Sequence, residues 1–140
     1  MFVLGGYSAA KRRLNDAHIL DMCYTGAVPQ ETGVSSAVWI QPKIEGNLPE
    51  QRAGHCALSV DDSIIIFGGS NSTGQRLGDT HILDTRTMRC CPIKIRLGER
   101  PPGRSYQAAG LVGRRLYILG GFDGVDVLKD VWYLDIGKRL

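Results

Sequence analysis

The chain has 140 residues, of which 43% are hydrophobic and 22% charged, and this composition is typical of one folded domain rather than of a disordered segment. Its formal net charge of +3 is too small to indicate a nucleic-acid partner. No apolar run approaches the roughly 20 residues that cross a bilayer, and the first apolar stretch, Phe2–Leu4, is far shorter than the core of a signal peptide. We therefore expect no membrane association and a cytoplasmic location.

The four cysteines are Cys23, Cys56, Cys90 and Cys91. They include no Cys-x-x-Cys pair, and two of them are adjacent, which suits neither a zinc site nor a disulfide framework. This arrangement favours a reducing compartment. For Cys90 and Cys91 we expect a structural role, with a redox role as the alternative.

Glycine is in excess, at 18 residues, and its distribution reveals an internal repeat. Gly-Gly pairs occur at Gly5–Gly6, Gly68–Gly69 and Gly120–Gly121, each directly after a short apolar run. A polar loop follows each pair, and then a segment that carries two aspartates five residues apart. These aspartates are Asp16 and Asp21, Asp79 and Asp84, and Asp130 and Asp135. Three copies of one pattern indicate a scaffold.

The first copy begins at the apolar run Phe2–Leu4, which we interpret as the second of four strands. Its third strand ends at Asp21, and its fourth carries Trp39. The residues between these two strands, 24–38, are rich in Gly, Ser, Thr and Pro, which predicts a lengthened loop of unknown role.

The second copy contains all four strands. The first runs from Arg52 to about Val60 with alternating apolar residues, and the second is the continuous apolar run Ile64–Phe67. The two residues Asp61–Asp62 between them predict a tight hairpin turn, so adjacent strands are antiparallel. Its fourth strand carries Cys91, 52 residues after the tryptophan of the first copy.

The third copy repeats the second and stops after its third strand, with the turn at Gly113–Arg114. In both copies an arginine, Arg52 or Arg104, lies 16 residues before the first glycine of the pair. No window predicts an amphipathic helix, because Gly, Pro and β-branched residues recur at strand spacing. The sequence therefore predicts an all-β chain of four-stranded antiparallel meanders.

These motifs together resemble the kelch repeat of β-propellers. The resemblance covers essentially the whole chain and implies an incomplete ring of about two and a half blades. Residues 1–48 form a blade without its first strand, 49–100 a complete blade and 101–140 a blade without its fourth strand. Such an arc exposes an apolar face at each end. We therefore expect either a fragment of a longer propeller or copies that associate to complete a ring.

Structural roles are the main expectation for the residues that most resemble a catalytic or metal site. His18 and His81 occupy equivalent positions, where the third copy has Trp132, which favours packing with an occasional hydrogen bond over a metal or general-base role. The repeated aspartates are expected to cap turn amides. Arg52 and Arg104 are expected to pair with such carboxylates between blades, with ligand binding at the mouth of the ring as the alternative.

Function is expected in the loops that join second to third strands, because a rigid meander displays its loops while its strands stay buried. These loops and the connections between blades carry an excess of positive charge. Candidate binding residues are Lys11, Arg12, Arg13, Arg76, Phe122 and Asp123, with Tyr7 as a further apolar anchor. The pattern predicts an acidic or phosphorylated peptide as partner, against an ordinary solvated loop set as the alternative.

The leading hypothesis is a non-enzymatic scaffold that binds a partner protein, without cofactor, metal, nucleic acid or membrane. The resemblance to kelch proteins implies this role, since many of them recruit other proteins. One alternative is the propeller portion of an enzyme, because the galactose-oxidase-like relatives of this fold include oxidases. Another is an arc whose self-association is itself the function.

Overall fold

The computed structural model describes residues 1–22, 37–95 and 98–137. Within these ranges every regular element is a β-strand, which confirms the expected all-β class. None of the described residues belongs to a helix long and apolar enough to cross a membrane. Cys23 and most of the expected long loop, residues 24–36, lie outside the described residues.

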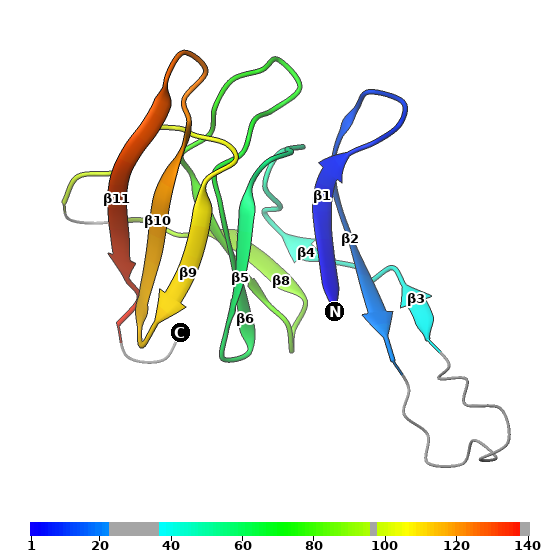
Figure 1. The fold of residues 1–140 in the computed structure, drawn as a ribbon. Helices are drawn as coiled ribbons and strands as arrows, with labels where there is room; N and C mark the ends of the chain where they lie inside the picture. Colours follow the sequence, from blue (N-terminus) through cyan, green and yellow to red (C-terminus); the bar gives the residue numbers. More distant parts are fainter. Residues whose placement is uncertain (23–36, 96–97, 138–140) are drawn as a thin grey trace, which may run out of the picture.

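The described residues form three sheets, which lie side by side in Figure 1. The first sheet has the order β1-β2-β3, and its strands are β1 (Phe2–Tyr7), β2 (Arg13–Asp21) and β3 (Val38–Ile40). The third sheet has the order β11-β10-β9, and its strands are β9 (Ala108–Val112), β10 (Arg115–Phe122) and β11 (Val127–Asp135). Both sheets are antiparallel throughout.

The middle sheet has the order β4-β8-β7-β6-β5. Its strands are β4 (Glu45–Gly46), β5 (Cys56–Val60), β6 (Ser63–Phe67), β7 (Thr80–Asp84) and β8 (Arg89–Pro92). Strands β5 to β8 form the expected four-stranded antiparallel meander. The short β4 pairs in parallel with β8, so the chain coming from the first sheet is attached to the outer edge of the middle sheet.

The first strand of the middle sheet is shorter than the sequence predicts. It starts at Cys56 rather than Arg52, because the backbone of Arg52 bridges to Leu14 of the neighbouring sheet instead. The expected hairpin turns are present, since Val60 pairs with Ser63 and Asp61 has a φ of 50°. Only the first of the two turn residues has positive φ, as in a type II′ turn.

The middle sheet is buried on both faces by its neighbours. Alternate residues of β6 point to opposite sides, as the pleat of a strand requires. Ile65 and Phe67 pack with Leu116 and Ile118 of the third sheet. Ile64 and Ile66 pack with Phe2 and Leu4 of the first. The described sheets thus stack as successive blades, in an open arc that does not close into a ring.

The first two Gly-Gly pairs lie against the backbone of the next blade, at Arg52 and Arg104. The φ of Gly68 is +71°, and a Cβ there would be 2.7 Å from the carbonyl oxygen of Arg104. Gly69 follows with a φ of +96° and donates a backbone hydrogen bond to the same oxygen, at 2.8 Å. A glycine pair therefore allows two backbones from adjacent sheets to bond directly.

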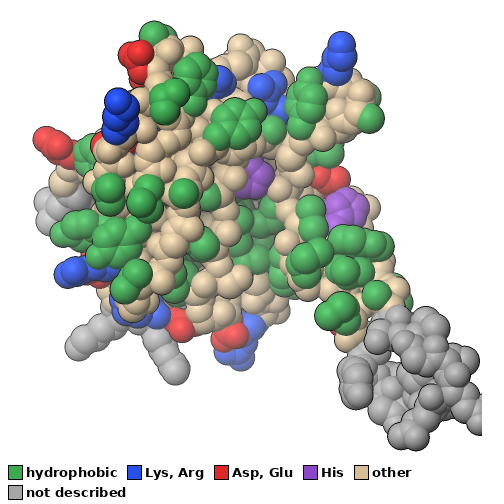
Figure 2. All heavy atoms as spheres, in the orientation of Figure 1, with side chains coloured by type: hydrophobic (Ala, Val, Ile, Leu, Met, Phe, Trp, Pro, Cys, Tyr) green, Lys and Arg blue, Asp and Glu red, His purple; other side chains and the backbone are tan. Residues whose placement is uncertain are grey.

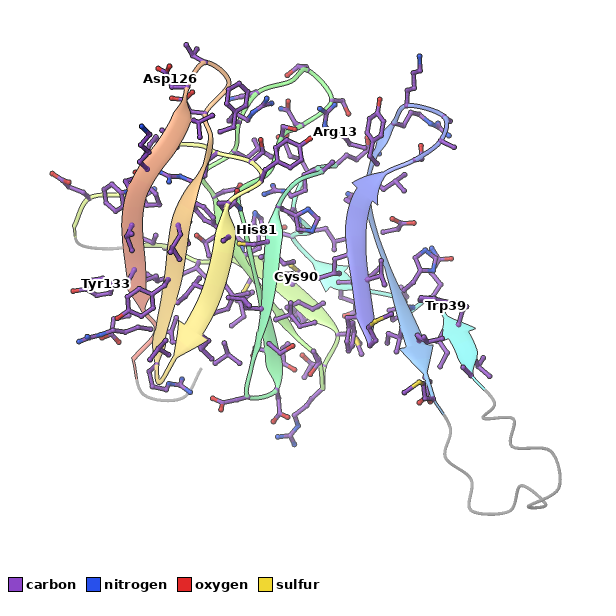
Figure 3. All side chains as sticks on the ribbon, in the orientation of Figure 1. Arg13, Trp39, His81, Cys90, Asp126 and Tyr133 are labelled. Atoms are coloured by element: carbon purple, nitrogen blue, oxygen red, sulfur yellow. The ribbon has the colours of Figure 1, made fainter. Side chains whose placement is uncertain are left out.

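One sequence-based alignment of the repeats is wrong by a residue. Trp39 pairs with Leu20, and Leu83, the equivalent leucine of the next blade, pairs with Cys90 rather than with Cys91. Trp39 is therefore equivalent to Cys90. Cys90 is buried between the first two sheets, whereas Trp39 lies on the outer side of the arc and is 57% exposed (Figure 3).

Candidate functional site

Arg52 links two blades through both its backbone and its side chain. Its backbone amide donates to Leu14 O, and its own carbonyl accepts from Gly6, both in the first blade at 3.0 Å. Its side chain turns into the middle blade, where Nη1 and Nη2 each donate to a different oxygen of Asp79 at 2.8 Å. Nη1 also donates to the carbonyl of Gly68 at 3.0 Å.

Arg104 repeats this arrangement between the middle and third blades. Its guanidinium bonds both carboxylate oxygens of Asp130, at 2.6 and 2.9 Å, and the carbonyl of Gly120, at 2.9 Å. These arginines were expected to pair with carboxylates of a neighbouring blade. Instead, each guanidinium bonds an aspartate of the sheet that follows it directly in sequence, Asp79 in the middle sheet and Asp130 in the third. The side chains of Arg52 and Arg104 are 2% and 0% exposed, so the structure gives a ligand no access to them.

The first aspartate of each repeat accepts a further bond from the residue two positions later. His18 and His81 place Nε2 at 3.0 and 2.8 Å from their aspartates, and Trp132 donates its indole N–H to Asp130 at 2.6 Å. Tryptophan thus replaces histidine as donor in the third blade. This geometry supports the structural interpretation of the two histidines.

These bonds lower the pKa of both aspartates that meet an arginine. Burial alone would raise the pKa of Asp79, but hydrogen bonds from His81 and Arg52 hold it well below its ordinary range. The bonds from Arg104 have the same effect on the pKa of Asp130. Both carboxylates are therefore ionised at neutral pH and do not act as general acids.

The second aspartate of the repeat fulfils the expected capping role. Oδ1 of Asp84 accepts the backbone amides of Arg86 and Thr87, at 2.8 and 2.9 Å, and Oδ1 of Asp135 accepts that of Gly137 at 3.0 Å. The two aspartates of one repeat therefore differ in function. One pairs with a buried arginine and the other closes a turn.

The loops after β1, β6 and β10, residues 8–12, 68–79 and 123–126, emerge together at the upper edge of the arc in Figure 1. We call these loops and the residues beside them, including Tyr7, Arg13, Tyr106 and Phe122, the loop face. Lys11 and Arg12 are exposed at the tip of its first loop, where Lys11 has a φ of 56°. Figure 2 shows basic side chains between hydrophobic ones along this edge.

Two arginines of the loop face occupy equivalent positions, eight residues after the first glycine of a pair, and both join neighbouring blades. Arg13 lies over the ring of Tyr7, 5.8 Å from its centroid, and donates to Ser70 Oγ of the next blade at 3.2 Å. Arg76 lies 5.1 Å from the ring centroid of Phe122, also in the next blade. Together these five residues form a row across three blades, which we call the arginine row. Figure 3 shows Arg13 at the upper end of its hairpin.

Asp123 has a different role from the other candidate binding residues. Its Oδ1 accepts the backbone amides of Asp126 and Val125, at 2.7 and 2.8 Å. These two bonds lower the pKa of Asp123. The carboxylate therefore shapes the β10–β11 turn, and it offers one oxygen rather than two to a ligand.

Tyr106 is a loop-face residue that the sequence analysis did not single out. Its side chain is 73% exposed and its φ is 59°, a left-handed conformation that is unfavourable for a bulky residue. It occupies the place of Gly54 in the preceding repeat and donates a backbone hydrogen bond to Gly54 O at 2.8 Å. Only the alignment with that glycine could have indicated the unusual backbone.

His55 and Gln107 are equivalent residues just below the loop face. Gln107 donates to the carbonyl of Phe67 at 3.0 Å, and His55 hydrogen-bonds the backbone of Leu4, the matching residue of the first blade. Burial and the nearby charge of Arg52 lower the pKa of His55 despite that bond. Within the described ranges no group of three or more His, Cys, Asp or Glu could hold a metal ion.

Comparison with known families agrees with this architecture. Residues 1–139 match the family described as the KLHDC2/KLHL20/DRC7 Kelch-repeats domain. The chain belongs to the kelch-repeat family. Kelch-repeat domains commonly serve as protein-interaction modules, and they are typically non-catalytic.

The kelch chain is also similar to segments of several longer proteins. It is 34% identical over 115 residues to host cell factor of Drosophila melanogaster, covering 78% of this chain and 7% of that protein. It is 36% identical over 108 residues to the serine/threonine-protein phosphatase BSL2 of Arabidopsis thaliana, covering 76% and 11%. The acyl-CoA-binding domain-containing protein 5 of the same plant is 30% identical over 124 residues, covering 88% and 17%. The chain thus spans less than a fifth of each of these relatives.

Proposed function

We propose that this chain is a protein-interaction module whose loop face binds an acidic or phosphorylated segment of a partner protein. The observation that carries the proposal is the arginine row: Arg13 and Arg76 are held at equivalent places by aromatic rings and by the next blade. The proposal assigns no catalytic step, cofactor or nucleic acid to the chain. It places the module in the cytoplasm.

The chemistry of the arginine row supports an anionic ligand. A guanidinium binds a carboxylate or phosphate through two parallel hydrogen bonds, and stacking on a ring reduces the number of orientations it can adopt. Lys11 and Arg12 add exposed positive charge at the same edge. Charge of one sign on a surface accelerates the encounter with an oppositely charged segment and makes binding depend on ionic strength.

Exposed aromatic residues in the row and beside it supply the apolar part of the proposed site. Tyr7 is 60% exposed and Tyr106 is 73% exposed. Tyrosine is favoured at protein interfaces because its ring buries a large area while its hydroxyl remains able to hydrogen-bond. The left-handed backbone of Tyr106 is a local strain of the kind found at functional sites.

A binding assay with defined substitutions tests the proposal. Peptides selected from a library rich in glutamate, aspartate and phosphoserine would be titrated against the protein and the double variant Arg13→Ala/Arg76→Ala. Arg86→Ala is the matched control, because Arg86 is a 76% exposed arginine on a turn away from the loop face. We expect the double variant alone to lose affinity, and added salt to weaken binding. Equal loss in the control, or no salt dependence, would contradict the proposal.

Self-association of arcs is a second candidate function, and the open ends of the arc favour it. On the middle blade, Ile64, Ile66, Leu83 and Cys90 are at most 4% exposed beneath the first blade. The residues at the equivalent positions of the first blade are Met1, Val3, Leu20 and Trp39. Of these, Met1, Val3 and Trp39 are 69%, 41% and 57% exposed. This end therefore has the apolar pattern of a buried blade interface.

The opposite end of the arc has a matching surface. Leu119 is equivalent to the buried Phe67 but is 45% exposed. Its partner on β11, Val131, is 62% exposed, and Tyr133, two residues further along β11, is 59% exposed. Figure 2 shows hydrophobic side chains spread over this outer face, and Figure 3 shows Tyr133 pointing away from the other blades. Light scattering over a range of concentrations tests the second candidate. A discrete oligomer that Leu119→Arg abolishes would support it, and a monomer at every concentration would exclude it.

A further inference from the structure

The loops at the two ends of the loop face carry opposite charge. The loop after β1 contains Lys11 and Arg12, and Arg13 follows it at the start of β2. The loop after β10 contains Asp123 and Asp126 and neither lysine nor arginine. Figure 3 shows Asp126 at the other end of the loop face from the hairpin that carries Arg13. The loop face is thus positive over the first blade and negative over the third.

The chain does not neutralise the charge at either end. Among the described residues, none of these five charged side chains takes part in an ion pair. Two backbone amides bond Asp123 and lower its pKa, so its carboxylate stays ionised at neutral pH. The next cation after Asp126 is Lys129, which lies in β11 on the same side of the strand as Val127 and Val131. Both ends of the loop face therefore remain able to bind a charged ligand.

The middle of the loop face offers an exposed ring rather than charge of one sign. Arg76 lies on the loop after β6, and Glu50 offsets its charge, because Oε1 of Glu50 accepts a bond from Asn71 of the same loop at 3.0 Å. The ring of Tyr106 lies over Gly54 of the middle blade, where an added Cβ would be 3.0 Å from its Cε1 atom. This ring is 73% exposed at the boundary between the middle and third blades. An apolar side chain of a ligand can pack on it.

The two charged ends are far enough apart to contact different residues of one ligand. Sheets that pack face to face lie about 10 Å apart, so the loops of the first and third sheets are separated by about 20 Å. This separation exceeds the Debye length of about 8 Å at physiological salt, so each end attracts or repels a ligand charge independently of the other. An extended chain covers the separation with about six residues.

We infer that the loop face binds a segment whose charge changes sign along its length. Acidic residues of this segment contact the basic side chains of the first blade, and an apolar residue packs on Tyr106. A basic residue about six positions from the acidic ones contacts Asp126. The inference rests on the proposed function, because it concerns the same surface, and it adds the order of charges that the partner carries. A segment that is acidic throughout is repelled at the third blade.

Two pairs of synthetic peptides test the order of charges. One pair has four glutamates, then five residues of leucine and serine, and then either lysine or glutamine. The other pair has the same residues in reverse order, because the charges do not determine the direction of the main chain. Affinity for the protein is measured by fluorescence anisotropy. In one pair we expect the lysine peptide to bind roughly twofold to fivefold more tightly than the glutamine peptide, as is typical of an exposed ion pair.

Substitutions in the protein locate the lysine of the peptide. Asp126→Asn removes one charge and keeps the backbone amide that bonds Asp123, so the turn is preserved. In this variant the lysine and glutamine peptides should bind equally. Asp62→Asn is the matched control, because Asp62 is a 67% exposed carboxylate on a turn at the other edge of the blades, and it should keep the difference. The double variant Arg13→Ala/Arg76→Ala should weaken both peptides alike.

The outcomes separate this inference from the proposed function. Equal affinity of the lysine and glutamine peptides for the unmodified protein, with both weakened in the double variant, would overturn the inference and leave the proposed function standing. A lysine preference that persists in Asp126→Asn would also overturn the inference, because the lysine would then bind elsewhere. If the double variant binds every peptide as the unmodified protein does, the proposed function fails together with the inference.

Discussion

Arg104 and Asp130 form a two-pronged ion pair in which the guanidinium is fully buried and the carboxylate is 38% exposed. The backbone of the same arginine bonds the preceding blade at Leu77 and Gly69. One residue therefore connects two blades, because its main chain bonds the preceding blade and its side chain bonds the blade that follows. Arg52 does the same one blade earlier.

Arg104→Lys should destabilise the chain although the charge is kept. A lysine cannot bond both oxygens of Asp130 and the carbonyl of Gly120 in the same plane, so at least one buried acceptor is left without a donor. We expect a loss of about 2–3 kcal/mol in the free energy of unfolding, measured by urea denaturation. Arg12→Lys, at an exposed loop position, should be neutral. Equal stability of the two variants would contradict the structural role of Arg104.

Gly68→Ala should be more damaging than Gly74→Ala. Both glycines have positive φ, +71° and +87°, so each alanine pays a similar backbone penalty of about 1 kcal/mol. At Gly68 the new Cβ would be 2.7 Å from a backbone oxygen of the next blade. At Gly74 no atom lies within 4 Å of the position that the Cβ would take. The difference between the two unfolding free energies isolates the close approach of blades. If the two variants are equally stable, the contact between the blades does not require a glycine at position 68.

His55→Gln should reduce the acid sensitivity of the fold. The pKa of His55 is lowered by burial and by Arg52, so the unfolded chain binds a proton more readily than the folded one. Stability from this residue is complete above the ordinary histidine pKa of about 6.5 and is lost as the pH falls through the lower folded value. Glutamine makes the equivalent inter-blade bond in the third blade. Between pH 7 and pH 5, the melting temperature of the variant should fall less than that of the unmodified protein. An equal fall in both proteins would exclude His55 as a cause of the acid sensitivity.

The adjacent cysteines should differ in reactivity toward iodoacetamide. Burial, together with the neighbouring Cys91, raises the pKa of Cys90 to about 11, and the thiolate is the reactive form. Cys90 is 1% exposed, whereas Cys91 lies on the surface. In the native protein, mass spectrometry should find position 91 modified in Cys90→Ser and position 90 unmodified in Cys91→Ser. Rapid modification of Cys90 would show that the interface between the first two blades opens readily.

Tyr106→Gly should separate stability from binding. Glycine relieves the left-handed backbone, so we expect unchanged or slightly higher stability, by up to about 1 kcal/mol. The same change removes an exposed ring from the loop face and should weaken the selected acidic peptide. Tyr106→Ala removes the ring but keeps the backbone strain. It should weaken peptide binding as much as Tyr106→Gly does, without the gain in stability. A large loss of stability in the glycine variant would show that the ring has a packing role instead.

The repeated features of the fold could be predicted from the sequence because each depends on short-range chemistry. Gly-Gly pairs after apolar runs and aspartates five residues apart recur often enough to identify blades. The Arg104–Asp130 pair joins residues 26 apart, and no local pattern distinguishes an aspartate that meets an arginine from one that caps a turn. The misalignment of Trp39 with Cys91 has the same origin, since the loop between the first two blades changes the repeat length.

The arginine row was only partly predictable. Positive charge in the loops identified Arg13 and Arg76, but not their stacking on rings or the bond from Arg13 to the next blade, because these contacts depend on how the blades pack. The turn-capping role of Asp123 and the exposure of Tyr106 could not be predicted, because both depend on the conformation of the backbone. A tyrosine with positive φ violates the ordinary preference for that conformation.

The most direct test of the interaction role is a hydrogen-exchange footprint of a peptide selected from the acidic library. The bound peptide should slow exchange in the three segments of the loop face that hold Arg13, Arg76 and Phe122. The turns at Asp61–Asp62 and Gly113–Arg114, which join strands at the other edge of the blades, should exchange as before. Protection confined to those turns, or no protection in the loop-face segments, would contradict the proposed role of the loop face.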